Sequence, residues 1–489
     1  MAASRGRAGG TEGPRYALPD WDVRELPAPP PFSARNLFRV IGPGAILLAT
    51  SIGGGEWLVG PAISVQYGRG VLWIATLAIV LQVLFNLEAV RYTLYTGEPI
   101  TTGFMRLRPG PRFWAPFYAL LCAAQLGFPA LAAGTATTVF ATFAGRLPGP
   151  EEGGALALVS YGVIASTFVL LLFGDTIERT LEYVSWTMVA YIFGFLVVVN
   201  VFFVPAGHWA ATFRGFFSVG ALPAGIDLPL VGALAASAAS GGVGNLAISN
   251  WFRDKGFGMG AHAGAISSAT SANVRSVAPT GSVFRVDGDS LRRWKVWWKY
   301  VHADQVWLWA AGCFVGMFLN VNLATSVVPP GTDLAGIEAG AYQAEYMARS
   351  LWSGFWFLAL LNGFWVMFST HLGNTEILVR MVTDILWAGS PEVRGLVRNH
   401  ARTLYYALFL LFTVWSSYVV GWGTAMVLMK WLANTAGLVL AISSVQLLVV
   451  NDRLLPKRLQ APPWRKAALA ICAVAYGSLF IAVVRSLLG

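Results

Sequence analysis

Long apolar stretches with few charges recur along the whole chain, and most are about the length that crosses a lipid bilayer. A membrane-spanning helix needs about 20 mostly apolar residues, and the runs at 71–90 and 404–420 come close to that requirement. Only 12% of the 489 residues are charged, against about 25% in soluble domains. These are too few charged residues to cover the surface of a water-soluble protein of this size. A transmembrane β-barrel would instead show short alternating segments. We therefore expect an all-α polytopic membrane protein.

Applying this length along the sequence predicts about 11 transmembrane helices. Residues 1–40 are rich in Arg, Pro and Gly and are expected to form a disordered cytoplasmic tail. The predicted helices cover 41–65, 71–94, 112–144, 155–173, 181–204, 229–250, 297–321, 351–384, 402–420, 422–449 and 464–487.

Positive charges are concentrated in alternate loops, which predicts the orientation of the chain. With a cytoplasmic N-terminus, most Lys and Arg fall on the cytoplasmic side, including a long basic loop at 251–296 that would lie against anionic lipid. We therefore expect a multi-pass protein of the cell membrane with an extracytoplasmic C-terminus. The net charge of +10 is explained by these loops, so we expect no nucleic-acid binding.

Two of the predicted helices carry glycine runs near their centres. The first helix contains Ser-Ile-Gly-Gly-Gly-Glu at 51–56, and the sixth contains Ser-Gly-Gly-Val-Gly-Asn at 240–245. Irregular backbone at membrane depth is tolerated only where it is buried in protein or lines a cavity, so we expect both helices to be interrupted there. Each opens a repeat of about five helices, at 41–204 and 229–450, and two such inverted repeats indicate a secondary transporter with its substrate site at the interruptions. Close helix packing at small residues is the alternative explanation.

The same segments resemble the Nramp (natural resistance-associated macrophage protein) family of metal-ion transporters. The similarity lies in Gly-Pro-Gly at 42–44, Thr-Gly-Glu at 96–98, Gly-Ala-Leu at 232–234 and Asn-Asp-Arg-Leu-Leu-Pro at 451–456. It implies a LeuT-type inverted-repeat fold, with an eleventh helix at 464–489, and secondary transport. Typical members bind a transition metal at Asp-Pro-Gly-Asn and Met-Pro-His interruptions, which this chain lacks, so it resembles a divergent, Nramp-related protein.

The donors available at the interruptions limit the expected substrate. One carboxylate with neutral oxygens suits hard cations of the Mn²⁺, Mg²⁺ or Ca²⁺ class. We expect a transporter that moves such a divalent cation by alternating access, with proton symport as a further expectation; an amino acid or other small organic solute is the alternative. Glu56 and Asn245 are the predicted metal ligands, and Asn434 is carried over from the resemblance. The predicted substrate-binding residues are Ser51, Gly53, Gly54, Glu56, Ser240, Gly241, Asn245 and Asn434.

Ionisable residues inside the predicted helices are costly and therefore suggest function. Glu88 and Arg91 are three residues apart, which places them on one helix face as an ion pair or a gate. A histidine such as His371 can relay protons near neutral pH, with Glu376 on the same helix. These four residues are the predicted proton-coupling or gating residues.

Other functional classes find little support in the sequence. We find no Walker-type loop, His-rich metal motif or nucleophile constellation, so we expect no enzymatic activity and no resident cofactor. A channel would need no pair of interrupted helices. Cys122, Cys313 and Cys472 lie in apolar runs and are expected to pack in the core. The oligomeric state is left open.

Overall fold

The computed structural model describes residues 18–172, 177–264, 277–334, 336 and 341–488, and this part of the chain is mostly helical. Within it, ten helical segments are long and apolar enough to cross a membrane. The uninterrupted ones are α4 Trp73–Thr96, α8 Gly153–Leu170, α9 Ile177–Phe203, α16 Phe355–Gly389, α18 Ala401–Val419, α19 Ala425–Leu454 and α20 Pro463–Leu488. The short elements are β1 Asp22–Val23, α1 Ala34–Val40, η2 Arg69–Val71, α5 Ile100–Met105, η3 Pro150–Glu152, α10 Ala206–Phe217, η4 Gly258–His262, β2 Ser282–Val283, α15 Tyr342–Ser350, α17 Pro391–Leu396, η6 Val420–Trp422 and η7 Lys457–Leu459.

The first membrane helix is interrupted where the glycine run predicts. It consists of α2 Pro43–Ser51, the π-helix η1 Gly54–Val59 and α3 Gly60–Tyr67. Proline suits the first turn of α2 because it lacks an N–H group that would have no partner there. The interruption is therefore confirmed, although the backbone beyond Gly53 rewinds as a wider π-helix instead of staying unwound.

The sixth membrane helix is broken into α11 Leu228–Ser237 and α12 Val243–Asp254. The gap contains Gly241 with φ +69° and Gly242 with φ +55°, left-handed conformations that glycine adopts at little cost. The predicted interruption of this helix is thus confirmed.

Helices three and seven are also divided. Helix three is α6 Pro111–Leu126 followed by α7 Ala130–Ala144. Helix seven is α13 Gly288–His302, the π-helix η5 Ala303–Ala310 and α14 Ala311–Val327. The predicted loop 251–296 is therefore wrong at both ends, since its first residues belong to α12 and its last to α13. The start of α13 was not predicted because its first turns are highly charged and do not resemble a membrane helix.

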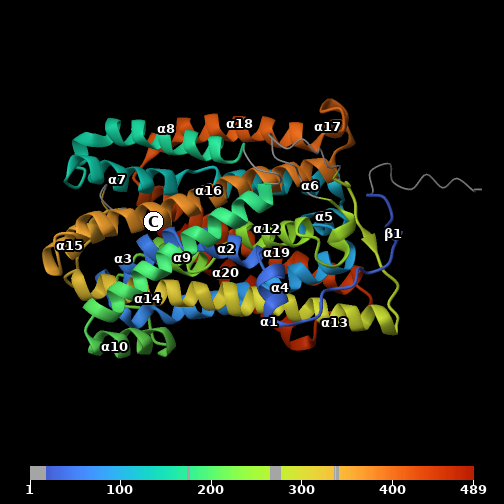
Figure 1. Ribbon diagram of the computed structural model, residues 1–489, viewed down its shortest axis with the longest axis horizontal. Helices are drawn as coiled ribbons and strands as arrows, with labels where there is room; N and C mark the ends of the chain where they lie inside the picture. The colour runs from blue at the N-terminus through green and yellow to red at the C-terminus, as the bar shows by residue number, and fades with distance from the viewer. Residues whose placement is uncertain (1–17, 173–176, 265–276, 335, 337–340, 489) are drawn as a thin grey trace, which may run out of the picture.

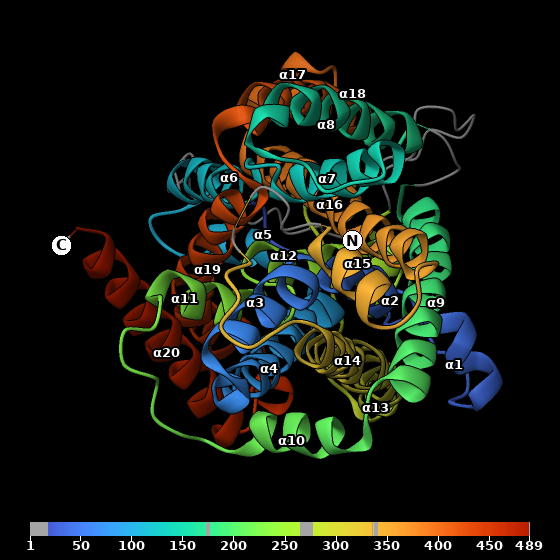
Figure 2. The same ribbon diagram turned by 90° about the vertical axis from the view of Figure 1, so that its left-hand side faces the viewer.

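The helices form central and peripheral layers. Figure 1 shows α8 and α18 stacked outside α7 and α16, and Figure 2 shows α20 and α10 at other edges with α2 and α3 inside. The most apolar window of the α2–α3 segment is 100% buried, against 22–28% for α8, α18 and α20. The outer helices thus turn most of their apolar surface away from the protein, as helices do toward lipid. α5, α13, α17 and β1 share one end of the bundle (Figure 1), which we call the basic end.

Residues 18–31, which we call the amino-terminal strap, are fastened to the basic end. β1 pairs in parallel with β2, Leu26 is buried, and Trp297 Nε1 donates to the Pro27 carbonyl at 3.0 Å. The predicted disordered tail is therefore wrong from residue 18 onward, because apolar strap residues find partners on the aromatic face of α13. Residues 1–17 of that predicted tail lie outside the described residues.

Candidate functional site

The two interrupted helices touch each other at their interruptions. Ser51 Oγ at the end of α2 lies 2.6 Å from Ser240 Oγ in the gap of helix six. A β-carbon added to Gly55 would lie 1.8 Å from the Ser237 carbonyl oxygen, so a side chain at position 55 would separate the two backbones. The structure thus brings the predicted site residues Ser51 and Ser240 into contact, and it places Gly55, next to Gly54 and Glu56, against Ser237 at the end of α11.

Glu56 lies in η1 and is completely buried. Its Oε2 accepts a hydrogen bond from the Gly53 N–H at 3.1 Å. Its Oε1 has no hydrogen-bond partner among the described residues. A buried polar atom without a partner costs about 1–3 kcal/mol, and more for a charged group. This oxygen is therefore a donor available to a cation at the centre of the protein.

Gly53 and Gly54 let two further helices approach the interruption. A β-carbon on Gly53 would lie 1.9 Å from Thr370 Oγ1 of α16, and one on Gly54 would lie 2.4 Å from Met429 Sδ of α19. The residues at the two interruptions include no methionine. The fold nevertheless places the Met429 thioether of α19, the tenth membrane helix, against Gly54. A sulfur atom as well as oxygen atoms therefore lies against the first interruption.

Two glutamines hold the gap of helix six. Gln82 Oε1 of α4 accepts from the Gly241 N–H at 3.0 Å, and its Nε2 donates to the Ala236 carbonyl at 3.2 Å. Gln125 Oε1 of α6 accepts from the Val243 N–H at 3.0 Å, and its Nε2 donates to the Gly241 carbonyl at 3.1 Å. Backbone groups freed by the interruption would otherwise be buried without partners, so these side chains stabilise the broken form.

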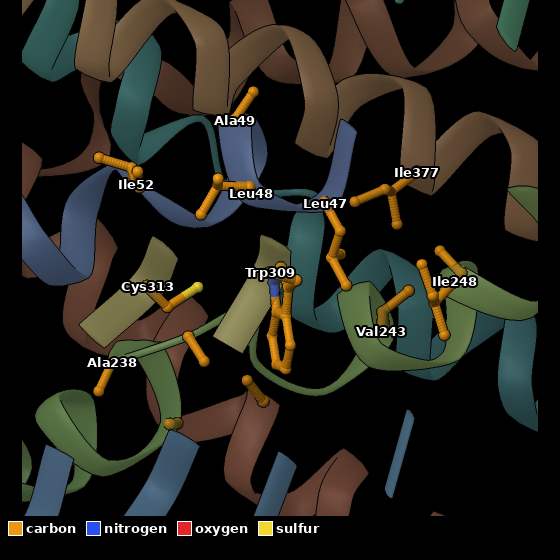
Figure 3. Packing of buried hydrophobic residues seen from close by; sticks show 14 of the residues in the cluster. Leu47, Leu48, Ala49, Ile52, Ala238, Val243, Ile248, Trp309, Cys313 and Ile377 are labelled. Atoms are coloured by element: carbon orange, nitrogen blue, oxygen red, sulfur yellow. The ribbon is translucent and has the colours of Figure 1, made fainter. Parts of the chain in front are cut away.

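Helix seven places a tryptophan and a cysteine against the end of α2. Trp309, the penultimate residue of η5, donates from Nε1 to Ser51 Oγ at 3.1 Å. Figure 3 shows its ring between α2 and the interrupted part of helix six, with Cys313 beside it. Both Trp309 and Cys313 are fully buried.

Asn245 belongs to a chain of buried side chains that are joined by hydrogen bonds. Its Nδ2 donates to Asn86 Oδ1 at 2.9 Å, and Asn86 Nδ2 donates to Gln305 Oε1 at 2.9 Å. Gln305 Nε2 then donates to Asp304 Oδ2 at 2.8 Å, and Asp304 Oδ1 accepts from the Gly42 N–H at 3.0 Å. This chain links the sixth helix to the amino end of α2, and Asn245 Oδ1 is without a partner among the described residues.

Glu88 and Arg91 form a buried ion pair toward the basic end of α4. Arg91 Nε donates to Glu88 Oε2 at 2.6 Å, and Arg465 Nη1 of α20 donates to Glu88 Oε1 at 3.1 Å. Arg465 Nη2 also lies 3.0 Å from His302 Nε2. The pair therefore ties helix eleven and helix seven to α4.

His371 and Glu376 occupy different surroundings on α16. Glu376 bonds to Arg380, which also bonds to Asp254 at the end of α12. His371 Nε2 has no partner in the described part of the chain. Its ring helps to line a cavity of about 10 Å³ beside Pro129, about the space of one water. The structure does not bring His371 and Glu376 together as a proton relay.

Asn434 lies away from the interruptions. Its Nδ2 donates to the Pro229 carbonyl in the first turn of α11 at 3.0 Å. It also donates to the Lys430 carbonyl, one turn earlier in α19, at 2.8 Å. Ser237, at the other end of α11, is about 12 Å farther along the helix at about 1.5 Å per residue. The expectation that Asn434 binds substrate stays a prediction; in this structure its amide is engaged in helix packing.

Sequence reasoning missed several residues at the contact between the interruptions. Gln82 could have been singled out, since a polar amide within an apolar membrane helix suggests a functional or structural role. Trp309, Cys313 and Met429 carried none, because they resemble ordinary residues of apolar helices. Among the described residues, no group of three or more His, Cys, Asp or Glu could hold a metal ion, so a cation here would rest on Glu56 together with neutral donors.

Solved structures with a similar fold are transporters. A mutant of the Eremococcus coleocola manganese transporter matches with a TM-score of 0.65 and 16% identity, over 96% of this chain and 91% of that chain. The same transporter in complex with an aromatic bis-isothiourea compound matches at 0.59 and 15%, over 96% and 90%. Mhp1, a nucleobase-cation-symport-1 family transporter in a closed conformation with bromovinylhydantoin bound, matches at 0.51 and 14%, over 91% and 90%. The sequence matches no protein-family model and no curated protein sequence.

At such identities the similarity concerns the fold. The match extends over 91–96% of this chain. The chain is therefore a multi-pass membrane protein with the LeuT-type helical fold of these transporters.

Proposed function

We propose that this protein is a secondary transporter that moves a divalent metal cation across the membrane by alternating access. One observation carries the proposal: the buried Glu56 Oε1 has no partner among the described residues and lies where the two interrupted helices meet. A lone anionic oxygen in a closed site favours a cation, and interrupted helices supply further carbonyl and half-helix partial charges. The similarity to a manganese transporter supports this class of substrate.

The donors around Glu56 define the ion panel to be tested. Ser51 and Ser240 supply hydroxyl oxygens, which suit ions of the Mn²⁺, Mg²⁺ or Ca²⁺ class. Cys313 and Met429 add sulfur, which suits thiophilic ions. The panel should therefore contain Cd²⁺ beside the three hard ions.

The proposed orientation of the chain in the membrane rests on the distribution of charge. We place the basic end, with the strap and the N-terminus, in the cytoplasm of a cell membrane protein and the C-terminus outside it. The two inverted repeats would be 41–204 and 229–450. The Glu88–Arg91 pair and the Glu376 cluster would hold the cytoplasmic end closed, since both tie separate helices together there. Proton coupling, through His371 or Glu56, is part of the proposal.

Isothermal titration calorimetry on the purified full chain in detergent tests the proposal, followed by flux in proteoliposomes. Unmodified protein should bind at least one divalent ion saturably and transport it, whereas Glu56→Gln should lose both while remaining folded. Glu151→Gln, at an exposed carboxylate between α7 and α8, is the control and should behave as the unmodified chain.

The outcomes separate the proposal from its alternative. Unchanged binding in Glu56→Gln would remove this carboxylate from the site. Absence of divalent binding to the unmodified chain would overturn the metal proposal and direct the search to amino acids and other small organic solutes.

A further inference from the structure

The oxygen of Ser51 has no capacity left for a ligand in this structure. A serine hydroxyl has one proton to donate and two lone pairs that accept. Ser51 Oγ donates its proton to the Leu47 carbonyl at 2.6 Å, so the Ser240 hydroxyl, 2.6 Å away, must be the donor to Ser51. Trp309 Nε1, which can only donate, occupies the second lone pair at 3.1 Å. Glu56 Oε1 is thus open to a ligand, whereas the Ser51 oxygen is fully used.

The indole N–H of Trp309 occupies a position that suits a cation. It carries partial positive charge, it is fully buried, and it points at an oxygen that lies at the contact of the two interrupted helices. A metal ion bound to Ser51 would need the same lone pair, so ion and indole exclude each other.

The π-helical backbone that carries Trp309 can change its conformation by converting to an α-helix. Trp309 belongs to the π-helix η5 in the middle of helix seven, and π-helical turns hold one residue more than α-helical turns and are frequent at functional sites. Conversion of this turn to an α-helix would shift the register by one residue, which is about 100° of rotation about the helix axis. Such a rotation would withdraw the indole from Ser51.

We propose that Trp309 is a placeholder for the transported cation, whose N–H occupies the Ser51 oxygen in the unloaded site and withdraws when the ion binds. The inference rests on the proposed function and adds a positioning residue to it. Withdrawal makes Ser51 a ligand beside Glu56, so the apparent ion affinity equals the intrinsic affinity multiplied by the fraction of molecules in which Trp309 has released the oxygen.

Replacing Trp309 by Phe tests the placeholder, because Phe keeps an aromatic ring and deletes the N–H. One hydrogen bond is worth about 0.5–1.5 kcal/mol, so calorimetry with Mn²⁺ should show binding roughly 2- to 12-fold tighter than in the unmodified chain. A residue that merely supported the fold would weaken binding when replaced. Trp387→Phe is the matched control, since the buried Trp387 Nε1 donates to the Val277 carbonyl at 3.1 Å away from the site, and it should leave the Kd unchanged.

A second measurement covers the case in which Trp309→Phe does not fold. Mn²⁺ added to Trp387→Phe and to the unmodified chain should change the indole bands of the near-ultraviolet circular dichroism equally in both. Affinity in Trp309→Phe equal to or weaker than in Trp387→Phe would overturn the placeholder, as would indole bands that stay constant at saturating Mn²⁺. Divalent binding that persists in either case leaves the proposed function standing, whereas no binding to the unmodified chain defeats both.

Discussion

The stability of the broken sixth helix should depend strongly on Gln125. This side chain is 1% exposed and bonds to two backbone groups of the gap, the Val243 N–H and the Gly241 carbonyl. Leucine has a similar volume but neither polar atom, so Gln125→Leu would leave both backbone groups buried without partners.

The expected loss follows from those two groups. Each buried backbone group that loses its partner costs about 1–3 kcal/mol, which gives about 2–6 kcal/mol for the pair. Burial of the added leucine surface offsets part of this cost, so we expect about 2–4 kcal/mol. For a chain of this size the entropy of unfolding is about 1 kcal/mol/K, so such a loss should lower the Tm by roughly 2–4 °C.

Thermal unfolding in detergent, followed by circular dichroism, is the assay. Thr135→Val on α7 is the control, because the buried Thr135 Oγ1 donates only to the Leu131 carbonyl one turn earlier; its Tm should fall by no more than about 2 °C, as expected for the loss of one hydrogen bond. The reasoning would be refuted if Gln125→Leu melted within a degree of Thr135→Val, since the gap would then not depend on the glutamine.

Two further substitutions test other parts of the structure. Gly54→Leu should abolish flux without loss of helical signal, because a β-carbon there already meets Met429 Sδ at 2.4 Å. Gly162→Leu on the outer α8 is the control and should transport normally, because a β-carbon there meets nothing within 4 Å. Normal flux in Gly54→Leu would contradict the tight packing at the interruption. Arg380→Met should destabilise the protein by about 3–5 kcal/mol by leaving the buried Glu376 carboxylate without its ion-pair partner, whereas Asp254 keeps its ion pair with Arg253; the measurement is the fall in Tm. Adding Glu376→Gln should recover part of that loss, and a double variant no more stable than Arg380→Met would argue against the pair.

The sequence was sufficient for the parts of the fold that depend on local composition. Apolar runs located the spans, and the glycine runs located both interruptions because a buried backbone break needs residues that tolerate unusual dihedrals or close approach, as Gly55 and Gly241 do. The start of α13 was missed because its charged first turns do not look like a membrane helix.

The partners across helices could not be obtained in this way. Trp309 and Met429 reach the site only because helices seven and ten pack against helix one, and nothing in their neighbouring residues signals that contact. Asn434 shows that a position carried over from a resemblance does not reveal its partners either, since its amide packs against the first turn of α11. Glu56 could be singled out from the sequence because it is a single carboxylate beside a glycine run, and the structure shows it completely buried there.

The strap has a consequence for how the protein is made. It contacts α13 through residues about 270 positions later in the chain, as in the Trp297–Pro27 hydrogen bond. At about 5–20 residues per second, a ribosome needs roughly 15–55 s to reach α13 after completing the strap. During that interval the strap has no docking surface, so its attachment is a late step of biogenesis that can occur only once the seventh helix has emerged.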